Sequence, residues 1–183
     1  MLVKCPICSY FLHTILSTYL SLMDFLEQFI NTSRDFPDEV ALVDNEKEYT
    51  YRDLSFRVRA YAATLDAITG NAPGELIGVM ANASFDTLST LLAIQSIGSG
   101  YLPIDTGVPH NQLCKIIVDA DLKYLLVEDE LAEEIRKVLN GLNGVQVIAL
   151  SVLANRSDQL APTPLESFDF FFFNDTATTE IYT

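Results

Sequence analysis

Apolar and polar positions along the chain follow two different periods, which predicts a succession of helices and strands. Residues 50–69 have apolar side chains at i, i+4, i+7, i+8 and i+11, the spacing of one helical face: Leu54, Val58, Tyr61, Ala62 and Leu65. Residues 76–81 are instead a near-continuous apolar run, as expected for a strand that is covered on both faces. The chain therefore combines helices with buried strands.

The same patterns recur along the rest of the chain. Helices are expected at residues 24–34, at 84–97, after Pro109 and at 130–140, where Gly141 ends the last helix. The expected inner faces are Phe25, Leu26, Phe29 and Ile30 in the first helix, Leu113, Ile116, Ile117 and Ala120 after Pro109, and Leu131, Ile135, Val138 and Leu139 in the last. Strands are expected at 40–43 and 48–51, as a hairpin, and at 101–105, 123–127 and 145–150. Because strands and helices alternate, the predicted fold class is α/β, around a mainly parallel sheet with right-handed crossovers.

Local signals fix some of the boundaries. Thr50 and Asp53 have the spacing of a capping box at a helix start. Gly98 and Gly100 bracket the end of the apolar helix at 84–97, where a left-handed residue is tolerated best as glycine. Pro103 cannot donate a hydrogen bond to a neighbouring strand, so the strand at 101–105 is expected at an edge or to be irregular.

Composition limits the class of protein. The 183 residues, 49% hydrophobic and 20% charged, suffice for one α/β domain with a sizeable core. The net charge of −14 argues against nucleic acid as a partner, because no basic surface is available to replace the counterions of a phosphate backbone. High net charge is otherwise typical of a well-solvated protein and indicates no particular ligand.

The cysteines indicate a reduced, cytoplasmic protein. Cys5, Cys8 and Cys114 are odd in number and form no even disulfide framework. Cys5 and Cys8 make a single C-x-x-C pair, without the second pair or the histidines that a closed zinc site requires.

Both ends of the chain differ from its body. Residues 1–22 contain one base, Lys4, and no acid, and we interpret them as an over-extended start ahead of Met23; a hydrophobic helix and a targeting signal are the alternatives. Residues 168–183 contain Phe170–Phe173 and end in FFFFNDTATTEIYT, which is similar to translated sequencing-adapter read-through; a genuine strand is the alternative. The body, residues 23–167, is expected to be one partial domain.

Two stretches of the body resemble the core motifs of the adenylate-forming enzymes (the AMP-dependent synthetases and ligases). Tyr49-Thr-Tyr-Arg-Asp-Leu54 is similar to the first motif, usually L-T/S-Y-x-E-L, and the segment from Leu92 to Asp105, which ends in Tyr-Leu-Pro-Ile-Asp, is similar to the second. Residues 36–44 and 123–127 resemble the flanking segments. The form of the second motif is closest to nonribosomal peptide synthetase adenylation domains and D-alanine–carrier protein ligases, although residues 95–97 and 99 depart from the usual pattern.

The resemblance implies a two-step reaction for the intact parent. A carboxylate, expected to be that of an amino acid, attacks ATP·Mg²⁺ to give an acyl-adenylate, and the thiol of a phosphopantetheinyl carrier protein then takes the acyl group. The family's phosphate loop follows the position of residue 165, and its catalytic lysine lies in a later domain. The resemblance therefore implies an N-terminal fragment without catalytic groups.

No catalytic, cofactor-binding or metal-binding residue is assigned from the sequence. Gly98-Ser-Gly100 lies at a helix end, so its amides do not converge on an anion, and helix capping is the interpretation. Asp86, Asp105 and Asp119 match no loop of alternating oxygen ligands. His13 and His110 have no nucleophile partner nearby in the sequence.

Two other functions remain open at this point. An acyl-CoA synthetase fragment of the same superfamily would share these motifs. A complete, non-enzymatic α/β binding module would share the pattern of helices and strands, although no glycine-rich loop follows the first buried strand. We also expect this piece of a larger fold to leave strands unpaired and apolar surface uncovered.

Overall fold

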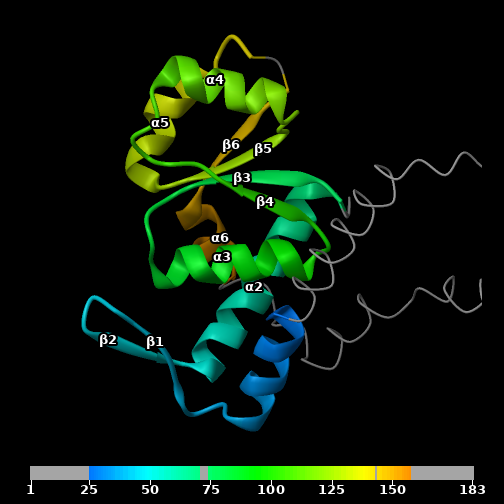
Figure 1. The fold of residues 1–183 in the computed structure, drawn as a ribbon, viewed down its shortest axis with the longest axis vertical. Helices are drawn as coiled ribbons and strands as arrows, with labels where there is room; N and C mark the ends of the chain where they lie inside the picture. Colours follow the sequence, from blue (N-terminus) through cyan, green and yellow to red (C-terminus); the bar gives the residue numbers. More distant parts are fainter. Residues whose placement is uncertain (1–24, 71–73, 143, 158–183) are drawn as a thin grey trace, which may run out of the picture.

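The fold is described from a computed structural model, which describes residues 25–70, 74–142 and 144–157 (Figure 1). After a helix at 25–35, the elements are β1 (Val40–Asp44), β2 (Lys47–Thr50), α2 (Tyr51–Thr69), β3 (Leu76–Met80), α3 (Phe85–Ser96), β4 (Gly100–Pro103), α4 (His110–Asp119), β5 (Tyr124–Val127), α5 (Asp129–Val138), β6 (Gln146–Ala149) and α6 (Leu150–Ser157). The predicted α/β class is confirmed.

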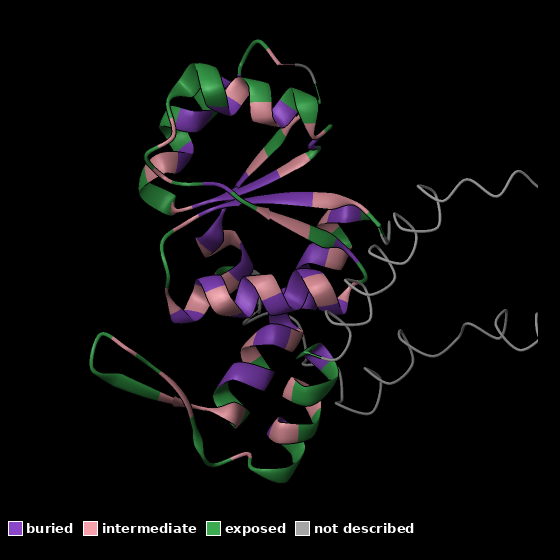
Figure 2. Cartoon of the chain, viewed as in Figure 1, coloured by how far each residue is buried: buried purple, intermediate pink, exposed green. Residues whose placement is uncertain are grey.

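The centre of the fold is a parallel four-stranded sheet in the order β4-β3-β5-β6. Helices α2, α3 and α6 cover one face, and α4 and α5 cover the other (Figure 1). Successive side chains of β3 point to opposite faces of the sheet. Ile77 and Val79 pack toward α2 and α3, while Met80 packs toward α4 and α5. This two-sided burial is the reason for the continuous apolar run (Figure 2).

Strand β4 lies at one edge of the sheet, as predicted from Pro103. The backbone N–H of Gly100 donates to the carbonyl of Glu75, just before β3, and that of Ile104 donates to the carbonyl of Val79 in β3. The backbone polar groups of the alternate residues, Tyr101 and Pro103, therefore point away from β3. Pro103 has no N–H to offer there, so its ring removes no hydrogen bond from the ladder.

The predicted hairpin is present as an antiparallel pair, β1 and β2, that projects from the rest of the molecule (Figure 1). Its two turn residues, Asn45 and Glu46, have φ of 48° and 66°. Two consecutive left-handed residues make the turn that matches the twist of a hairpin. A register shift between Val40 and Leu42 leaves both Val40 and Val43 exposed.

The capping box at the start of α2 is also confirmed. Thr50 Oγ1 accepts a hydrogen bond from the N–H of Asp53 at 3.2 Å, and Oδ2 of Asp53 accepts one from the N–H of Thr50 at 3.0 Å. At the other end Gly70 adopts φ 70° and its N–H donates to the carbonyl of Asp66. Both ends of α2 are therefore capped by residues that the sequence pattern indicated, Thr50 and Gly70.

One exposure and two boundaries differ clearly from the predictions. Phe25 is 56% exposed, while Leu26 is buried, because the inner stripe of the first helix is narrower than the apolar pattern suggested. Helix α5 ends at Val138 and leaves a turn before Gly141. Leu150 opens a helix, α6, instead of closing a strand; the sequence after it has no cap signal that would have predicted this helix.

Several predictions concern residues outside the described ranges, namely the leader at 1–22 with Cys5, Cys8 and His13, and the tail at 168–183. Among the residues that are described, no helix combines the length and the apolar character needed to cross a membrane.

Candidate functional site

Three loops meet where the strands β3, β4 and β5 end. The backbone N–H of Asn82, after β3, donates to Oε1 of Glu128, after β5, at 2.6 Å, and Asn82 Nδ2 donates to Oε2 at 3.1 Å. Thr106, after β4, places its Oγ1 at 3.5 Å from Oδ1 of Asn82. We call Asn82, Thr106 and Glu128 the carboxyl-edge cluster.

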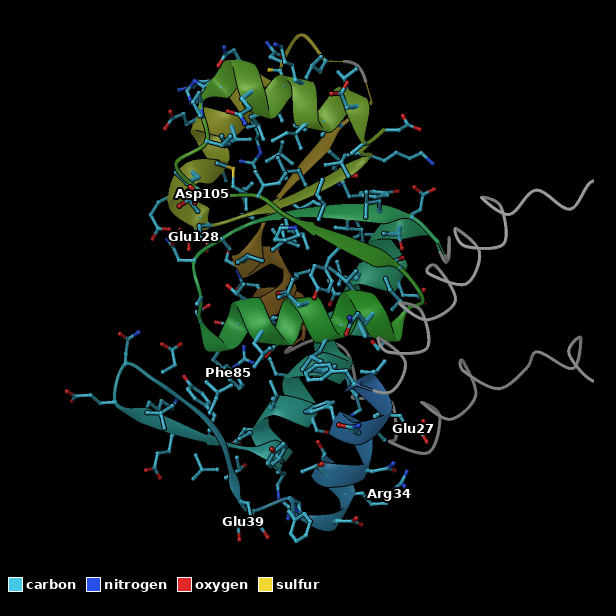
Figure 3. All side chains as sticks on the ribbon, viewed as in Figure 1. Glu27, Arg34, Glu39, Phe85, Asp105 and Glu128 are labelled. Carbon is cyan, nitrogen blue, oxygen red and sulfur yellow. The ribbon has the colours of Figure 1, made fainter. Side chains whose placement is uncertain are left out.

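The topology makes this edge the natural place for a ligand. Helix α3 leaves β3 toward one face of the sheet, whereas α5 leaves β5 toward the other, so the chain diverges between these neighbouring strands. In open α/β sheets, ligands bind in the crevice that such a divergence opens at the carboxyl ends of the strands. Figure 3 labels Asp105 and Glu128 at this end.

The charge of this edge is negative, and its polar groups are already paired. Asp105 Oδ1 accepts from the N–H of Gly107 at 2.6 Å, and Ser151 Oγ donates to Asp129 Oδ1 at 2.5 Å. The backbone amide of Asn82, which could otherwise bind an anion, is bound by the carboxylate of Glu128. The Asn82 amide is therefore not free to bind a phosphate oxygen in this arrangement.

The acidic residues singled out from the sequence lie on separate elements. Asp86 is in the first turn of α3, Asp105 follows β4, and Asp119 is the last residue of α4. Within the described ranges, no three His, Cys, Asp or Glu side chains are grouped so as to hold a metal ion. The structure therefore does not bring these three carboxylates together.

The other candidates have structural partners. His110 Nε2 lies 3.0 Å from Glu134 Oε1, which joins the start of α4 to α5. Gly98 adopts φ 72° one residue beyond Ile97, the C-cap of α3, and its N–H donates to the carbonyl of Gln95. The capping interpretation of Gly98 is confirmed. Cys114 is a free, half-buried thiol on α4.

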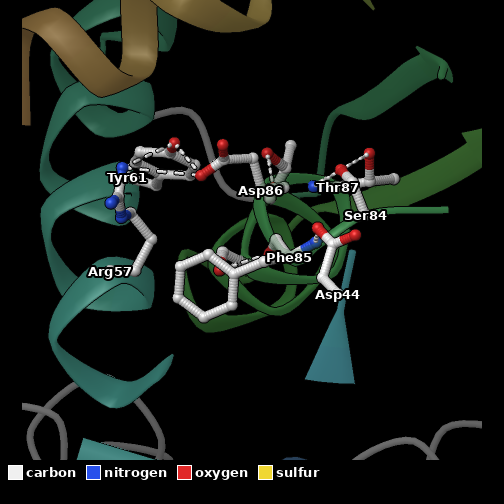
Figure 4. Close-up of polar contacts among 9 residues, drawn as sticks. Asp44, Arg57, Tyr61, Ser84, Phe85, Asp86 and Thr87 are labelled. Atoms are coloured by element: carbon white, nitrogen blue, oxygen red, sulfur yellow. Dashed lines mark hydrogen bonds and ion pairs between the residues drawn. The ribbon is translucent and has the colours of Figure 1, made fainter. Parts of the chain in front are cut away.

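A second polar network joins α2 to the first turn of α3 (Figure 4). The Tyr61 hydroxyl donates to Asp86 Oδ1 at 2.7 Å, and Arg57 Nη1 lies 3.3 Å from the Tyr61 oxygen and 3.5 Å from Asp86 Oδ1. Burial, with the neighbouring Asp86 carboxylate adding to it, raises the pKa of the Tyr61 phenol far above its ordinary range. The phenol therefore stays neutral and works as a hydrogen-bond donor.

The hairpin contacts the same turn of α3. Asp44 Oδ2 accepts from the N–H of Phe85 at 2.9 Å, and the ring of Tyr49 stacks on that of Phe85 with 3.8 Å between centroids and 9° between planes. Ser84 caps the helix by accepting from the N–H of Thr87 at 3.0 Å. A carboxylate at this position also interacts favourably with the positive end of the helix.

Described residues of both motifs lie in capping, packing and strand-end positions. In the first motif, Thr50 and Asp53 form the cap and Leu54 is buried. In the second, Leu92, Ala93 and Ile94 are buried on α3, while Pro103 ends the edge strand. The interpretation of these motifs as capping, packing and turn elements agrees with where their side chains lie.

Sequence reasoning missed the Asn82–Glu128 and Asp44–Phe85 contacts, which join residues 46 and 41 positions apart. For the first pair a signal existed, because each residue follows a buried strand of a parallel sheet by one or two positions. Nothing in the local sequence indicated the second pair, since the orientation of the hairpin is set by tertiary packing.

The fold defines a class of protein, the doubly wound α/β proteins. At the carboxyl edge of the sheet, the carboxylates of Glu128 and Asp105 accept hydrogen bonds from neighbouring backbone amides. A family model described as AMP-binding enzyme matches residues 29–170. The chain belongs to the AMP-binding enzyme family, and the resemblance predicted from the two motifs is confirmed.

Curated relatives are much longer than this chain. Bacitracin synthase 1 of Bacillus licheniformis is 30% identical over 107 residues, which are 58% of this chain and 2% of the relative. Hybrid PKS-NRPS synthetase 1 of Dothistroma septosporum is 34% identical over 125 residues, 68% of this chain and 3% of the relative. The chain thus spans a small fraction of the length of these proteins.

Solved structures share the fold. A nonribosomal peptide synthetase bound to alpha-methyl-L-serine-AMP matches 76% of this chain and 15% of its own, with a TM-score of 0.64 and 24% identity. The NpsA N-terminal subdomain of Klebsiella oxytoca, in complex with 3-hydroxybenzoyl-AMSN, matches 76% of this chain and 34% of its own, with a TM-score of 0.64 and 22% identity. The sheet and helices described above are those of the N-terminal subdomain of adenylate-forming enzymes.

Proposed function

We propose that this chain is the N-terminal part of an amino-acid adenylation domain. The intact parent activates an amino-acid carboxylate with ATP, forming an acyl-adenylate and pyrophosphate, and passes the acyl group to the thiol of a phosphopantetheinyl carrier protein. The observation that carries this proposal is the family match over residues 29–170, which includes both motifs in the strand–helix context expected for them.

An amino acid is the proposed substrate class because of the form of the second motif and of what one structural neighbour binds, although another neighbour binds 3-hydroxybenzoyl-AMSN. One neighbour is bound to alpha-methyl-L-serine-AMP, and another is a fused adenylation–PCP di-domain with a TM-score of 0.62. These ligands and partners belong to those proteins. They support, for the parent of this chain, an acyl-adenylate intermediate and a carrier-protein partner.

We propose that residues 23–167 supply scaffold and no catalytic group. The carboxyl-edge cluster is negatively charged and internally paired, whereas transfer at the α-phosphate of ATP requires amides, hydroxyls and a cation around developing negative charge. On this proposal ATP and Mg²⁺ are held by parts of the parent that follow this region, and the 183-residue chain alone is inactive.

Amino-acid-dependent exchange of labelled pyrophosphate into ATP tests the activity. The purified 183-residue chain is expected to give no exchange above a blank without amino acid. The polypeptide encoded by the uninterrupted source gene is expected to exchange with one or a few of the proteinogenic amino acids. Exchange by the chain alone would contradict the proposed inactivity, and a parent that responds only to acetate or fatty acids would identify an acyl activator instead.

The source DNA tests the proposed boundaries. Amplification across codon 167 is expected to show a frame that continues into a Thr-, Ser- and Gly-rich segment in place of codons 168–183. A continuous natural frame that encodes Phe170–Phe173 and ends at Thr183 would refute the interpretation of the tail. Mass measurement of the native N-terminus tests the proposed start at Met23 in the same way.

A further inference from the structure

Asn140 and Gly141 are the two central residues of a turn that follows α5. The N–H of Leu142 donates to the carbonyl of Leu139 at 2.9 Å and closes the turn, and both central residues are exposed. Within the described part of the chain, neither the Asn140 side chain nor the Gly141 N–H makes a hydrogen bond. A side-chain amide and the next amide of the backbone are therefore both in solvent with no partner to restrain them.

The other described asparagines are restrained. The N–H and Nδ2 of Asn82 both donate to the carboxylate of Glu128. Oδ1 of Asn111 accepts from the N–H of the next residue in the chain at 3.0 Å. The rest are Asn31 and Asn155, which lie in helices, and Asn45, whose Nδ2 donates to a neighbouring carboxylate. Among the described asparagines, Asn140 is also the one that a glycine follows.

We propose that Asn140-Gly141 is a modification site at which the side-chain amide is lost spontaneously through a cyclic imide. The Gly141 nitrogen gives its proton to hydroxide and attacks Cγ of Asn140; the new C–N bond forms, and the side-chain nitrogen takes up a proton and leaves as ammonia. Water then opens the ring. Cleavage between the ring nitrogen and the main-chain carbonyl gives isoaspartate, and cleavage at the side-chain carbonyl gives aspartate.

The backbone of this turn can reach the geometry that the attack needs. Ring closure requires the Gly141 nitrogen to approach Cγ from outside the turn conformation, and glycine gives the chain the widest choice of backbone angles while leaving the nitrogen uncrowded. The turn is weakly held, because α5 ends at Val138 and the N–H of Asn140 lies 3.4 Å from the carbonyl of Lys137, a long hydrogen bond. Exposed turns with few backbone hydrogen bonds open at low free-energy cost.

The reaction changes both charge and backbone at one end of α5. A neutral amide becomes a carboxylate, so the net charge of −14 gains one further negative unit. Negative charge is unfavourable after the carbonyl end of a helix. Isoaspartate also adds a methylene group to the main chain between α5 and β6. Two forms of the protein, separable by charge, are therefore expected to accumulate with time.

Timed incubation of the 183-residue chain tests the proposal, followed by tryptic peptide mapping with fragmentation that separates isoaspartate from aspartate. Cleavage after Lys137 and Arg156 releases one peptide that contains both Asn140 and Asn155, so the helical asparagine is an internal control. Asn140 is expected to convert at least about tenfold faster than Asn155, with isoaspartate among the products and a rate that rises with pH. Asn143-Gly144 has the same sequence, but Asn143 lies outside the described residues, so its conversion is measured separately.

Gly141→Ala is the matched variant, because a Cβ at this position would meet no atom within 4 Å and the fold is left undisturbed. The added methyl group crowds the attacking nitrogen, and conversion of Asn140 is expected to slow at least about tenfold. Circular dichroism establishes that wild type and variant are folded. Conversion of Asn140 no faster than that of Asn155 overturns the proposal, and a rate that is unchanged in Gly141→Ala overturns the attack by the Gly141 nitrogen.

Discussion

The hydroxyl of Tyr61 donates a 2.7 Å hydrogen bond to Oδ1 of Asp86, and this bond joins α2 to the first turn of α3 across 25 positions of sequence. The Tyr61 side chain is buried. Arg57 lies over the rings of Tyr61 and Phe85 and approaches the same carboxylate. The contact holds α2, which begins within the first motif, against α3, which contains the start of the second motif.

Replacement of Tyr61 by Phe tests that contact. The variant keeps the buried ring and removes the donor, so the free energy of unfolding is expected to fall by about 1–2 kcal/mol, the range for a hydrogen bond to a charged but partly solvated group. Urea denaturation measures the change. Tyr124→Phe is the control, because the hydroxyl of that tyrosine takes no part in the network; a loss as large in Tyr124→Phe would contradict the assignment.

Alkaline pH is expected to destabilise the wild type through the same residue. Burial raises the pKa of Tyr61 above its ordinary value of 10.0, so the folded state retains this proton at pH values where the unfolded state releases it. Its contribution to stability is complete below pH 10 and is lost progressively as pH rises through the raised pKa. Unfolding free energies measured well below and well above that ordinary value check this, and Tyr61→Phe should show a smaller decline.

The capping box gives a prediction with the opposite dependence on pH. Thr50→Ala is expected to cost about 1 kcal/mol at neutral pH, while Thr50→Ser, which keeps the hydroxyl, should cost much less. Hydrogen bonds from the backbone and side chain of Thr50 lower the pKa of Asp53 below its ordinary value of 3.8. The contribution of Asp53 is therefore present above pH 3.8 and lost as pH falls through its lowered pKa, so an equal cost of Thr50→Ala at low pH would contradict it.

Gly78 of β3 has no room for a side chain. A Cβ there would lie 2.8 Å from Cδ1 of Leu125 and 3.0 Å from Cδ1 of Leu122, both buried. Gly78→Ala is expected to destabilise the fold by about 1–3 kcal/mol, as overpacking of a core does. Gly141→Ala is the control, because a Cβ at this surface turn would have no neighbouring atom within 4 Å; thermal unfolding should separate the two variants clearly.

The stacked rings of Tyr49 and Phe85 hold the hairpin against α3. Tyr49→Ala removes the stack, which contributes about 0.5–1.5 kcal/mol beyond its buried area, and also the ring over which Lys47 lies. Tryptic cleavage after Lys47 is expected to accelerate up to about tenfold. Val43→Ala, on the exposed side of the hairpin, should leave the rate near that of the wild type, and equal acceleration in both variants would contradict the role of the stack.

Much of the fold was determined by local sequence. The capping box of Thr50 and Asp53, the two-sided apolar run of β3 and the proline of β4 each encode their own structure within a few residues. Hydrogen bonds between close neighbours, and the need to bury an apolar stripe, act regardless of what the distant chain does. For that reason the element order as far as β6 and the family resemblance could be predicted from local patterns alone, whereas α6 could not.

Only the tertiary structure decided which loops share the carboxyl edge and how the hairpin lies on α3. Asn82 meets Glu128, and Asp44 meets Phe85, because crossovers and packing bring together residues 46 and 41 positions apart. At that edge the carboxylate of Glu128 accepts the hydrogen bond of the Asn82 backbone amide. Such pairings depend on the summed geometry of the whole sheet, which no local pattern contains.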